Sequence, residues 1–188
     1  MKGRVLEPAL LVPHPDHPPR SLRGVTARVI GLDDNWLSLR WRVEGARGLV
    51  VPLFAGKGRA DGLWQTTCFE MFLAEDSEAA QGSYCEFNLS PSERWAAYDF
   101  DAYREGMAAR PLPRQPVLTA RTGQDVLIFD AVLPRAGLPT LPCRMGLTAV
   151  LEEEGGTKSY WALAHGPGKA DFHHAACFAA RLEAPLVP

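Results

Sequence analysis

Apolar and polar residues alternate with a period of two in the clearest segments of this chain, a pattern that favours strands with one buried face. Over residues 37–44 the apolar side chains are Leu37, Leu39, Trp41 and Val43, and each is followed by a polar residue. Successive side chains point to opposite faces of a strand, so one set faces a core and the other faces solvent. This segment therefore predicts an antiparallel strand at the surface of a core.

Prolines and glycines divide the rest of the chain into short segments. The sequence has 16 prolines and 17 glycines, scattered rather than concentrated, and such residues end or interrupt strands. We expect further strands at residues 25–29, 68–73, 84–89, 117–121, 126–133, 144–151, 159–163 and 178–182. Residues 49–54 predict an edge or irregular strand because of Pro52. The helical candidates, residues 75–80 and 101–107, are short.

About ten short strands without helices between them favour an all-β fold. We predict a two-layer antiparallel β-sandwich, of jelly-roll or immunoglobulin-like type, with one or two short helices. The chain has 188 residues, of which 46% are hydrophobic, and this is enough for one core without disulfide bonds. We therefore expect a single domain over residues 1–188.

The charge and cysteine patterns disfavour several partners and compartments. Twenty basic residues against 22 acidic ones, with no long run of like charge, argue against nucleic acid and against a membrane surface. No apolar run reaches the roughly 20 residues that cross a bilayer, and prolines interrupt the first apolar stretch before it attains signal-peptide length. We expect a cytoplasmic protein with packed free thiols at Cys68, Cys85, Cys143 and Cys177.

Residues 68–73 and 84–89 predict a hairpin whose faces differ in chemistry. If the apolar set faces the core, then Glu70, Glu86 and Asn88 share the opposite face, where the two carboxylates lie side by side; the apolar set is Phe69, Met71, Leu73, Cys85, Phe87 and Leu89. The register of the two strands is left open. Such carboxylates could flank a glycosidic bond, line a polar binding groove with Arg104 as a bidentate partner, or belong to a solvated outer face.

Two of the tryptophans are candidates for a ligand site. Trp64 lies in a loop that enters the carboxylate strand, and Trp161 could occupy a matching position on another strand. Indole rings stack on the apolar faces of sugars, while carboxylates and amides bind the hydroxyl groups. The alternative is that these residues fill the core or cover an edge, as we expect for Trp41.

A weaker candidate is a metal site formed by His165, Asp171 and His173. Carboxylate and imidazole groups suit zinc or iron. Adjacent histidines on a strand point to opposite faces, so at most one of His173 and His174 can join such a cluster, and no clear fourth ligand follows from the sequence. The alternative is a hydrogen-bonded turn that anchors the last strand.

Several blocks together resemble the bacterial DOMON-like family, which is similar to DOMON domains and to the ninth family of carbohydrate-binding modules. The blocks are residues 63–73, 86–91 and 95–100, extended by 160–165 and 171–173. The resemblance implies a β-sandwich that binds sugar or haem and is not a catalyst. Sugar-binding relatives hold a terminal sugar between two tryptophans, for which Trp64 and Trp161 are the candidates. Haem-binding relatives use a methionine with a histidine or lysine, whereas Met71 falls on the predicted core face.

The function expected from the sequence is a non-catalytic module that binds a saccharide-like small molecule and needs no cofactor. Its ligand-binding residues would be Trp64, Glu70, Glu86, Asn88, Arg104 and Trp161. One alternative is a glycoside-active or metal-assisted enzyme that uses the two glutamates or the histidine cluster. Another is a haem-binding or purely structural interaction domain. On a wet face, Glu70→Gln or Glu86→Gln would cost no more than about 1 kcal/mol of stability.

Overall fold

The computed structural model describes residues 7–76 and 82–185 and confirms the all-β prediction. Its strands are β1 (Ala9–Pro13), β2 (Gly24–Leu32), β3 (Trp36–Glu44), β4 (Gly58–Arg59), β5 (Cys68–Glu75), β6 (Tyr84–Leu89), β7 (Arg94–Phe100), β8 (Ala108–Ala109), β9 (Val117–Thr122), β10 (Val126–Pro134), β11 (Cys143–Glu153), β12 (Thr157–Ala162) and β13 (Ala180–Leu182). Single 3₁₀ turns are the helical elements of these residues: η1 (Ala46–Gly48), η2 (Leu63–Gln65), η4 (Arg135–Gly137) and η5 (Ala175–Cys177). None of the described helices has the length and hydropathy needed to span a membrane.

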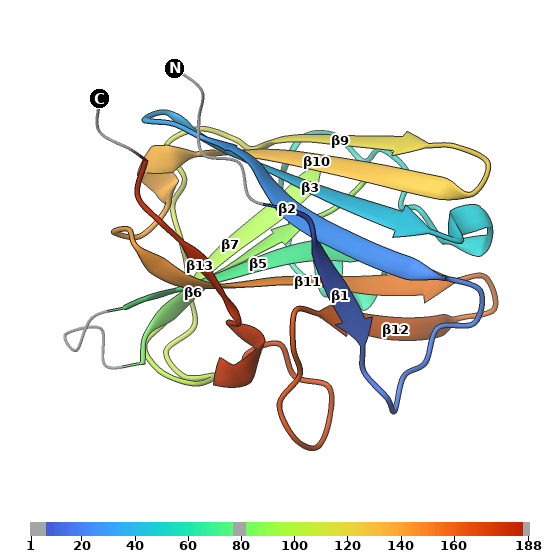
Figure 1. Cartoon of the computed structure of the whole chain (residues 1–188). Coiled ribbons are helices and arrows are strands. Elements are labelled where there is room, and N and C mark those ends of the chain that lie inside the picture. The colour runs from blue at the N-terminus through green and yellow to red at the C-terminus, as the bar shows by residue number, and fades with distance from the viewer. Residues whose placement is uncertain (1–6, 77–81, 186–188) are drawn as a thin grey trace.

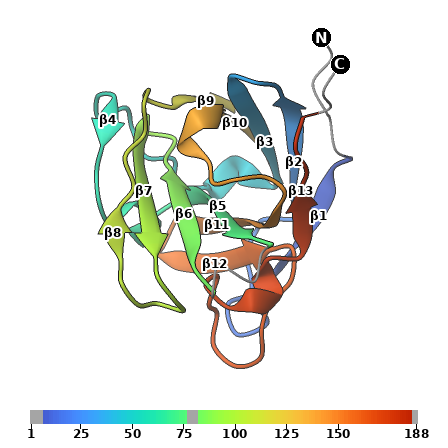
Figure 2. The ribbon, with the colours of Figure 1, turned by 90° about the vertical axis from the view of Figure 1, so that its left-hand side faces the viewer.

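The strands form one continuous sheet that curls on itself. Its order is β4-β7-β6-β5-β11-β12-β1-β2-β3-β10-β9, with β13 beside β11 and β8 beside β7. Every described pair is antiparallel except β4 with β7. The view along the curl shows β2, β3, β9 and β10 lying opposite the half that contains β5, β11 and β12 (Figure 2). Strand β1 pairs with β2 on one side and with β12 on the other, so it joins these two parts of the curled sheet edge to edge (Figure 1).

An apolar core fills the space between the two halves of the curled sheet. Phe69 of β5 stacks on Phe129 of β10 with 4.5 Å between ring centroids, and Trp41 of β3 lies 5.6 Å from Phe69. All three side chains are fully buried. Burial of a ring of this size is worth roughly 2–3 kcal/mol. These contacts therefore pack β5 against β3 and β10, which are not its neighbours in the sheet.

Strand β1, which connects the two halves, was not expected from the sequence. Leu10 pairs with Thr26 of β2, and Val12 pairs with Ala162 of β12. Within the strand only Leu11 is fully buried. The residues on both faces of β1 are apolar, so alternation, which depends on a polar face, does not reveal this strand.

The helix expected over residues 101–107 is wrong, because the segment forms a tight turn. Arg104 and Gly106 have φ angles of +58° and +67°, which a right-handed helix cannot contain. A Cβ atom at Gly106 would lie 2.0 Å from the Asp101 carboxylate, so glycine is required there. Of the other candidate helix, Glu75 belongs to β5, and residues 77–80 lie outside the described residues.

The strand expected at residues 49–54 is also wrong, since Leu49 makes only an isolated bridge to Glu153. Conversely, strand β7, which lies between β6 and β4 in the sheet, was not expected from the sequence. Most of its residues are buried, on both faces. A strand covered on both faces lacks a polar period, which explains why alternation did not predict it.

The outer face of β5, β6 and β7 is covered by a second apolar cluster. Every residue of β6, and every residue of β5 except Glu75, is buried. The C-terminal residues 163–178 contribute Phe172 and Phe178 to this cover; the full cluster is Phe72, Ala74, Tyr84, Ala96, Tyr98, Phe100, Val150, Ala162, Phe172 and Phe178. The solvated outer face considered as an alternative is therefore wrong, and this covered face holds the candidate site.

Candidate ligand pocket

A pocket of about 330 Å³ opens in the second apolar cluster. Side chains from β5, β6, β7, β11 and β12 form its floor and walls, and η2, the 101–107 turn and the C-terminal segment contribute the rest. The lining residues are Trp64, Glu70, Phe72, Glu86, Tyr98, Phe100, Arg104, Met107, Val150, Tyr160, Ala170, Asp171, Phe172 and His173. The pocket thus combines a mainly aromatic wall with a few ionisable groups.

The strand register confirms that Glu70 and Glu86 share a face and also fixes their relation. Glu70 lies opposite Asn88, whereas Glu86 lies opposite Phe72. The two glutamates are therefore diagonal neighbours on adjacent strands, rather than a directly opposed pair. The apolar set of the hairpin faces the inner core, as the alternation predicted. Both carboxylate residues are nevertheless buried, with 3% and 6% of their surface exposed.

Glu70 is held in an environment that favours its neutral form. Its carboxyl group accepts a hydrogen bond of 3.2 Å from the hydroxyl of Thr148, which lies opposite it on β11. Burial raises the pKa of Glu70 well above its usual range, the charge of Glu86 raises it further, and the Thr148 hydrogen bond only partly opposes this. Burial therefore favours the protonated form of the Glu70 carboxyl, which can donate a hydrogen bond.

Glu86 titrates near neutrality. Burial raises the pKa of its carboxyl group to about 7, against the lowering effects of the Asn88 amide and the positive charge of Arg104. The floor of the pocket consequently holds one carboxyl whose neutral form is favoured and one that can carry a charge at physiological pH. The two groups interact, so the protonation of either depends on the other.

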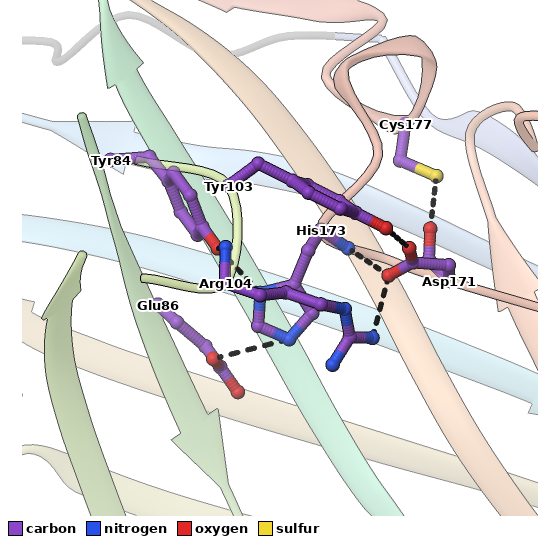
Figure 3. A network of polar contacts seen from close by, with 7 residues as sticks. All are labelled: Tyr84, Glu86, Tyr103, Arg104, Asp171, His173 and Cys177. Atoms are coloured by element: carbon purple, nitrogen blue, oxygen red, sulfur yellow. Dashed lines mark hydrogen bonds and ion pairs between the residues drawn. The ribbon is translucent and has the colours of Figure 1, made fainter. Parts of the chain in front are cut away.

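His173 approaches Glu86 from the C-terminal segment (Figure 3). The Tyr84 hydroxyl accepts a hydrogen bond from the backbone N–H of Arg104 and lies 2.7 Å from Nδ1 of His173. We assign the Tyr84 proton to this second contact, which leaves the neutral imidazole protonated at Nε2. That nitrogen lies 3.8 Å from the Glu86 carboxylate. Burial, aided by the charge of Arg104, lowers the pKa of His173 to about 4, so this contact is not an ion pair at neutral pH.

Arg104 and Asp171 form an ion pair at the edge of the pocket. Nη2 of Arg104 lies 2.7 Å from the Asp171 carboxylate, which also accepts hydrogen bonds from the Tyr103 hydroxyl and from the backbone N–H of His173. Burial alone would raise the pKa of Asp171, but the hydrogen bonds from Arg104 and Tyr103 lower it. Asp171 therefore fastens the C-terminal segment to the 101–107 turn (Figure 3).

Trp64 belongs to the 3₁₀ turn η2, immediately before β5. Gly62 precedes the turn with a φ angle of +73°, a conformation that favours glycine. The Lys158 ammonium group binds the carbonyl of Gln65 and so ties the turn to β12. Trp64 is 43% exposed and lines the pocket, so its indole ring is accessible to a ligand.

Trp161 does not lie in the pocket, contrary to the sequence prediction. It is 3% exposed and belongs to the inner core, where its indole N–H donates to the Ser159 hydroxyl at 2.8 Å. The neighbouring residue, Tyr160, lines the pocket instead. Successive residues of β12 point to opposite faces, so a shift of one position exchanges the core residue for the pocket residue.

Asn88 lies beside the pocket rather than in its lining. It is fully buried between Glu70 of β5 and Ala96 of β7, under the region where η2 packs on the sheet. Within the described part of the chain, neither atom of its amide group has a hydrogen-bond partner. The polar amide of Asn88 nevertheless lies near Glu86 and lowers the pKa of its carboxyl group.

The structure separates the residues of the candidate metal site. His165 donates from Nε2 to the Val12 carbonyl at 2.9 Å, whereas Asp171 binds Arg104 and His173 binds Tyr84. Over residues 7–76 and 82–185, no group of three or more ligating side chains is placed to hold a metal ion. The alternative interpretation, a hydrogen-bonded turn, therefore describes residues 165–173 better than a metal site does. Met71, the methionine considered for haem, is fully buried in the inner core.

Sequence reasoning missed most of the aromatic wall, including Tyr98 and Phe100 of β7 and Phe172 of the C-terminal segment. The Tyr98 ring is fixed by its hydroxyl, which donates to Asp61 at 2.6 Å, and by the guanidinium of Arg59 4.9 Å from its centroid. The alternation of Ala96, Tyr98 and Phe100 could have revealed this wall if residues 94–100 had been recognised as a strand. Nothing periodic marks Phe172.

No family model matches the sequence, and no curated protein matches it. Among solved structures the chain is similar to a family 9 carbohydrate-binding module from Caldicellulosiruptor kristjanssonii in complex with cellotriose, with 17% sequence identity, a TM-score of 0.42, and coverage of 86% of this chain and 74% of that chain. A second similar structure is a module of that family and organism in complex with glucose, with 16% identity, a TM-score of 0.41, and coverage of 80% and 74%. Similarities at this level establish neither a shared fold nor a shared ligand. The resemblance to the DOMON-like family stays a prediction.

Proposed function

We propose that this protein is a non-catalytic binding module whose pocket holds a saccharide-like small molecule. The observation that carries the proposal is the chemistry of the pocket, which combines the accessible indole of Trp64, a wall of aromatic rings and two carboxyl groups. Sugars offer apolar ring faces that pack on aromatic side chains, and hydroxyl groups that bind carboxyl oxygens. A volume of about 330 Å³ lies at the lower end of the usual range for small-molecule sites, which suits a monosaccharide-sized ligand.

Each polar group has a distinct part in this proposal. The protonated Glu70 donates a hydrogen bond to a ligand oxygen, whereas Glu86 accepts one when it is ionised. The Arg104–Asp171 ion pair keeps the 101–107 turn and the C-terminal segment together at the pocket edge. Trp64 stacks on the ligand from the exposed side.

Calorimetric titration with a panel of monosaccharides and disaccharides tests the proposal. We expect at least one sugar to bind, and we expect Trp64→Ala to weaken that binding while leaving the fold intact by circular dichroism. Trp36→Ala is the control, because Trp36 lies on β3 in the other half of the sheet. Absence of binding to every sugar in the panel would overturn the saccharide proposal.

A glycoside-active enzyme is the second candidate, because two carboxyl groups with different protonation states lie in one pocket. Their diagonal register places their Cβ atoms roughly 7 Å apart in an ordinary sheet. Release of aryl alcohol from aryl glycosides, and its loss in Glu86→Gln, would replace the binding proposal with this one.

Three expectations from the sequence remain part of the proposal. They are a single module over residues 1–188, membership of the jelly-roll or immunoglobulin-like sandwiches, and a cytoplasmic location. The continuous curled sheet and its shared core support the first two. The four buried free cysteines are in keeping with the third.

A further inference from the structure

Acidic and basic side chains occur in unequal numbers in the lining of the pocket. Three of them are acidic, Glu70, Glu86 and Asp171, and one is basic, Arg104. Arg104 is already paired with Asp171 at 2.7 Å. Among the described residues, no arginine or lysine lies within ion-pair distance of either glutamate. The pocket floor therefore has carboxyl groups without a fixed cationic partner.

His173 does not supply the missing positive charge. Its Nε2 atom lies 3.8 Å from Glu86, which is too long for a hydrogen bond. Its imidazole is neutral at neutral pH, because burial lowers its pKa to about 4. Glu86 is 94% buried, since only 6% of its surface is exposed. A buried carboxylate without a cation is costly, and a ligand can relieve that cost.

The aromatic walls favour the same kind of ligand. Six of the lining residues carry phenyl, phenol or indole rings: Trp64, Phe72, Tyr98, Phe100, Tyr160 and Phe172. The face of such a ring attracts a cation within about 6 Å of its centroid, most strongly where water is excluded. The carboxyl groups and the ring faces of the pocket thus both attract a cationic group of a ligand.

We propose that the pocket prefers a ligand with a protonated amine, whose ammonium group binds Glu86 with the Glu70 carboxyl beside it and ring faces around it. The inference rests on the proposed function, because it specifies the saccharide as an amino sugar with a free amine. A neutral sugar offers the pocket hydroxyl groups only and leaves the Glu86 charge uncompensated.

Binding of such a ligand is coupled to the release of protons by Glu86. The ionisable or charged groups around Glu86 are Glu70 of β5, Tyr84 of β6, Tyr98 of β7, Arg104 of the turn, and Asp171 and His173 of the C-terminal segment. An ammonium group next to Glu86 stabilises its ionised form. Below pH 7, where part of the Glu86 population is protonated in the free protein, binding of the amine therefore releases protons. It releases more of them than binding of a neutral sugar, which offers the ionised Glu86 a hydrogen bond but no positive charge.

Calorimetry at pH 7 with glucosamine, glucose and N-acetylglucosamine tests the preference directly. These probes share the ring but differ in the group at one carbon, which is a protonated amine, a hydroxyl or a neutral amide. We expect glucosamine to bind at least about tenfold more tightly than either neutral probe, a difference of about 1.4 kcal/mol. Glu86→Gln should abolish this difference, and Glu44→Gln, a matched change on β3, should preserve it.

A second measurement needs no variant. At pH 6.5, the heat of glucosamine binding is measured in two buffers of different ionisation enthalpy. We expect the heat to depend on the buffer more strongly for glucosamine than for glucose, because more protons are released to the buffer. An equal dependence for the two sugars would contradict the amine preference.

The remaining outcomes separate this inference from the proposed function. If glucose binds as tightly as glucosamine, the amine preference is overturned, and the saccharide proposal stands. Benzylamine and benzyl alcohol extend the test to a ligand that is not a sugar. If benzylamine binds and no sugar does, the amine preference stands and the saccharide proposal is overturned. If neither the five probes nor any other sugar of the panel binds, both are overturned.

Discussion

Glu86 and His173 lie 3.8 Å apart at Oε2 and Nε2, and burial shifts their pKa values in opposite directions. The pKa of Glu86 rises from 4.5 to about 7, and that of His173 falls from 6.5 to about 4. Burial disfavours the charged form of either group, so both are neutral over a shared range of mildly acidic pH. Glu86 and His173 have residue types and a separation that suggest an ion pair. Between about pH 4 and pH 7, however, both side chains are neutral.

The first prediction concerns Glu86 and the pH dependence of stability. A carboxyl whose pKa is raised on folding binds more protons in the folded state, so its contribution to stability falls as pH rises from 4.5 to about 7. Glu86→Gln has no carboxyl group to titrate, so it does not lose stability in this way as pH rises. Its free energy of unfolding relative to the wild type should rise across that window, by up to about 3 kcal/mol. Urea unfolding at a series of pH values measures it; a difference that does not change with pH would contradict the assignment.

His173→Gln should show the opposite dependence. A histidine whose pKa is lowered on folding costs stability as pH falls from 6.5 to about 4, because only the unfolded state gains the proton readily. The variant escapes this loss, so its stability relative to the wild type should rise as pH falls through that window. The same urea series measures both variants, with Glu44→Gln as a control that should follow the wild type. A parallel response of the two variants would rule out opposite shifts.

The second prediction compares the two faces of β6. Phe87 is fully buried in the inner core, so Phe87→Ala should cost about 3–5 kcal/mol through the cavity it leaves. Glu86→Gln keeps the size of the side chain and should change stability at pH 5, where Glu86 is protonated, by no more than about 1 kcal/mol. Chemical denaturation checks both. If Glu86→Gln unfolds the protein while Phe87→Ala does not, the strand faces are inverted.

Alternation was sufficient to predict which residues of the hairpin share a face, but it contains no information about what covers that face. Phe69 and Phe87 alternate with Glu70 and Glu86, and the structure keeps that order. The covering residues come from a segment about 100 positions further along, around Phe172, which has no period that sequence analysis could use. For that reason the expected wet face is buried, and the pKa shifts of the glutamates could not be foreseen.

The lack of long-range information in local sequence patterns also explains why the environments of single site residues were predicted incorrectly. Tyr160 and Trp161 differ by one position, and a sequence pattern of aromatic residues cannot tell which of the two faces the pocket. Arg104 was expected to pair with a carboxylate, and it does, but with Asp171 from the C-terminal segment. Long-range contacts of this kind are fixed by the fold and not by the local sequence.

The third prediction uses the different positions of two tryptophans. Trp64 is exposed at the pocket, and Trp161 is buried in the core. A sugar that binds should therefore change the fluorescence of Trp64, and Trp64→Phe should remove most of that change. Trp161→Phe should lower stability and yet retain the fluorescence response to the ligand. If Trp161→Phe alone abolishes the response at full occupancy, then the ligand does not contact Trp64 in this pocket.

The fourth prediction is that Asp171→Asn weakens the preference for an amine. Asparagine carries no charge, so it cannot neutralise Arg104 as Asp171 does. The positive charge of Arg104 already lowers the pKa of Glu86. In the variant this charge is free to compensate that of Glu86. The ratio of glucosamine to glucose affinity should fall severalfold. A titration of both sugars, with Asp125→Asn as the control for loss of an exposed ion pair, measures the ratio. An unchanged ratio in Asp171→Asn would mean that Arg104 stays remote from the bound ligand.

The fifth prediction concerns the four cysteines, all of which are free and buried. The thiolate is the form that attacks thiol reagents, and burial raises the pKa of Cys85 to about 12 and that of Cys143 to about 11. Cys68 is fully buried as well, and burial raises its pKa in the same way. We therefore expect slow modification of the folded protein, at a rate set by unfolding, and reaction of all four thiols in denaturant without prior reduction. A deficit of two thiols in denaturant would reveal a disulfide, and rapid reaction of the folded protein would show that a cysteine is accessible.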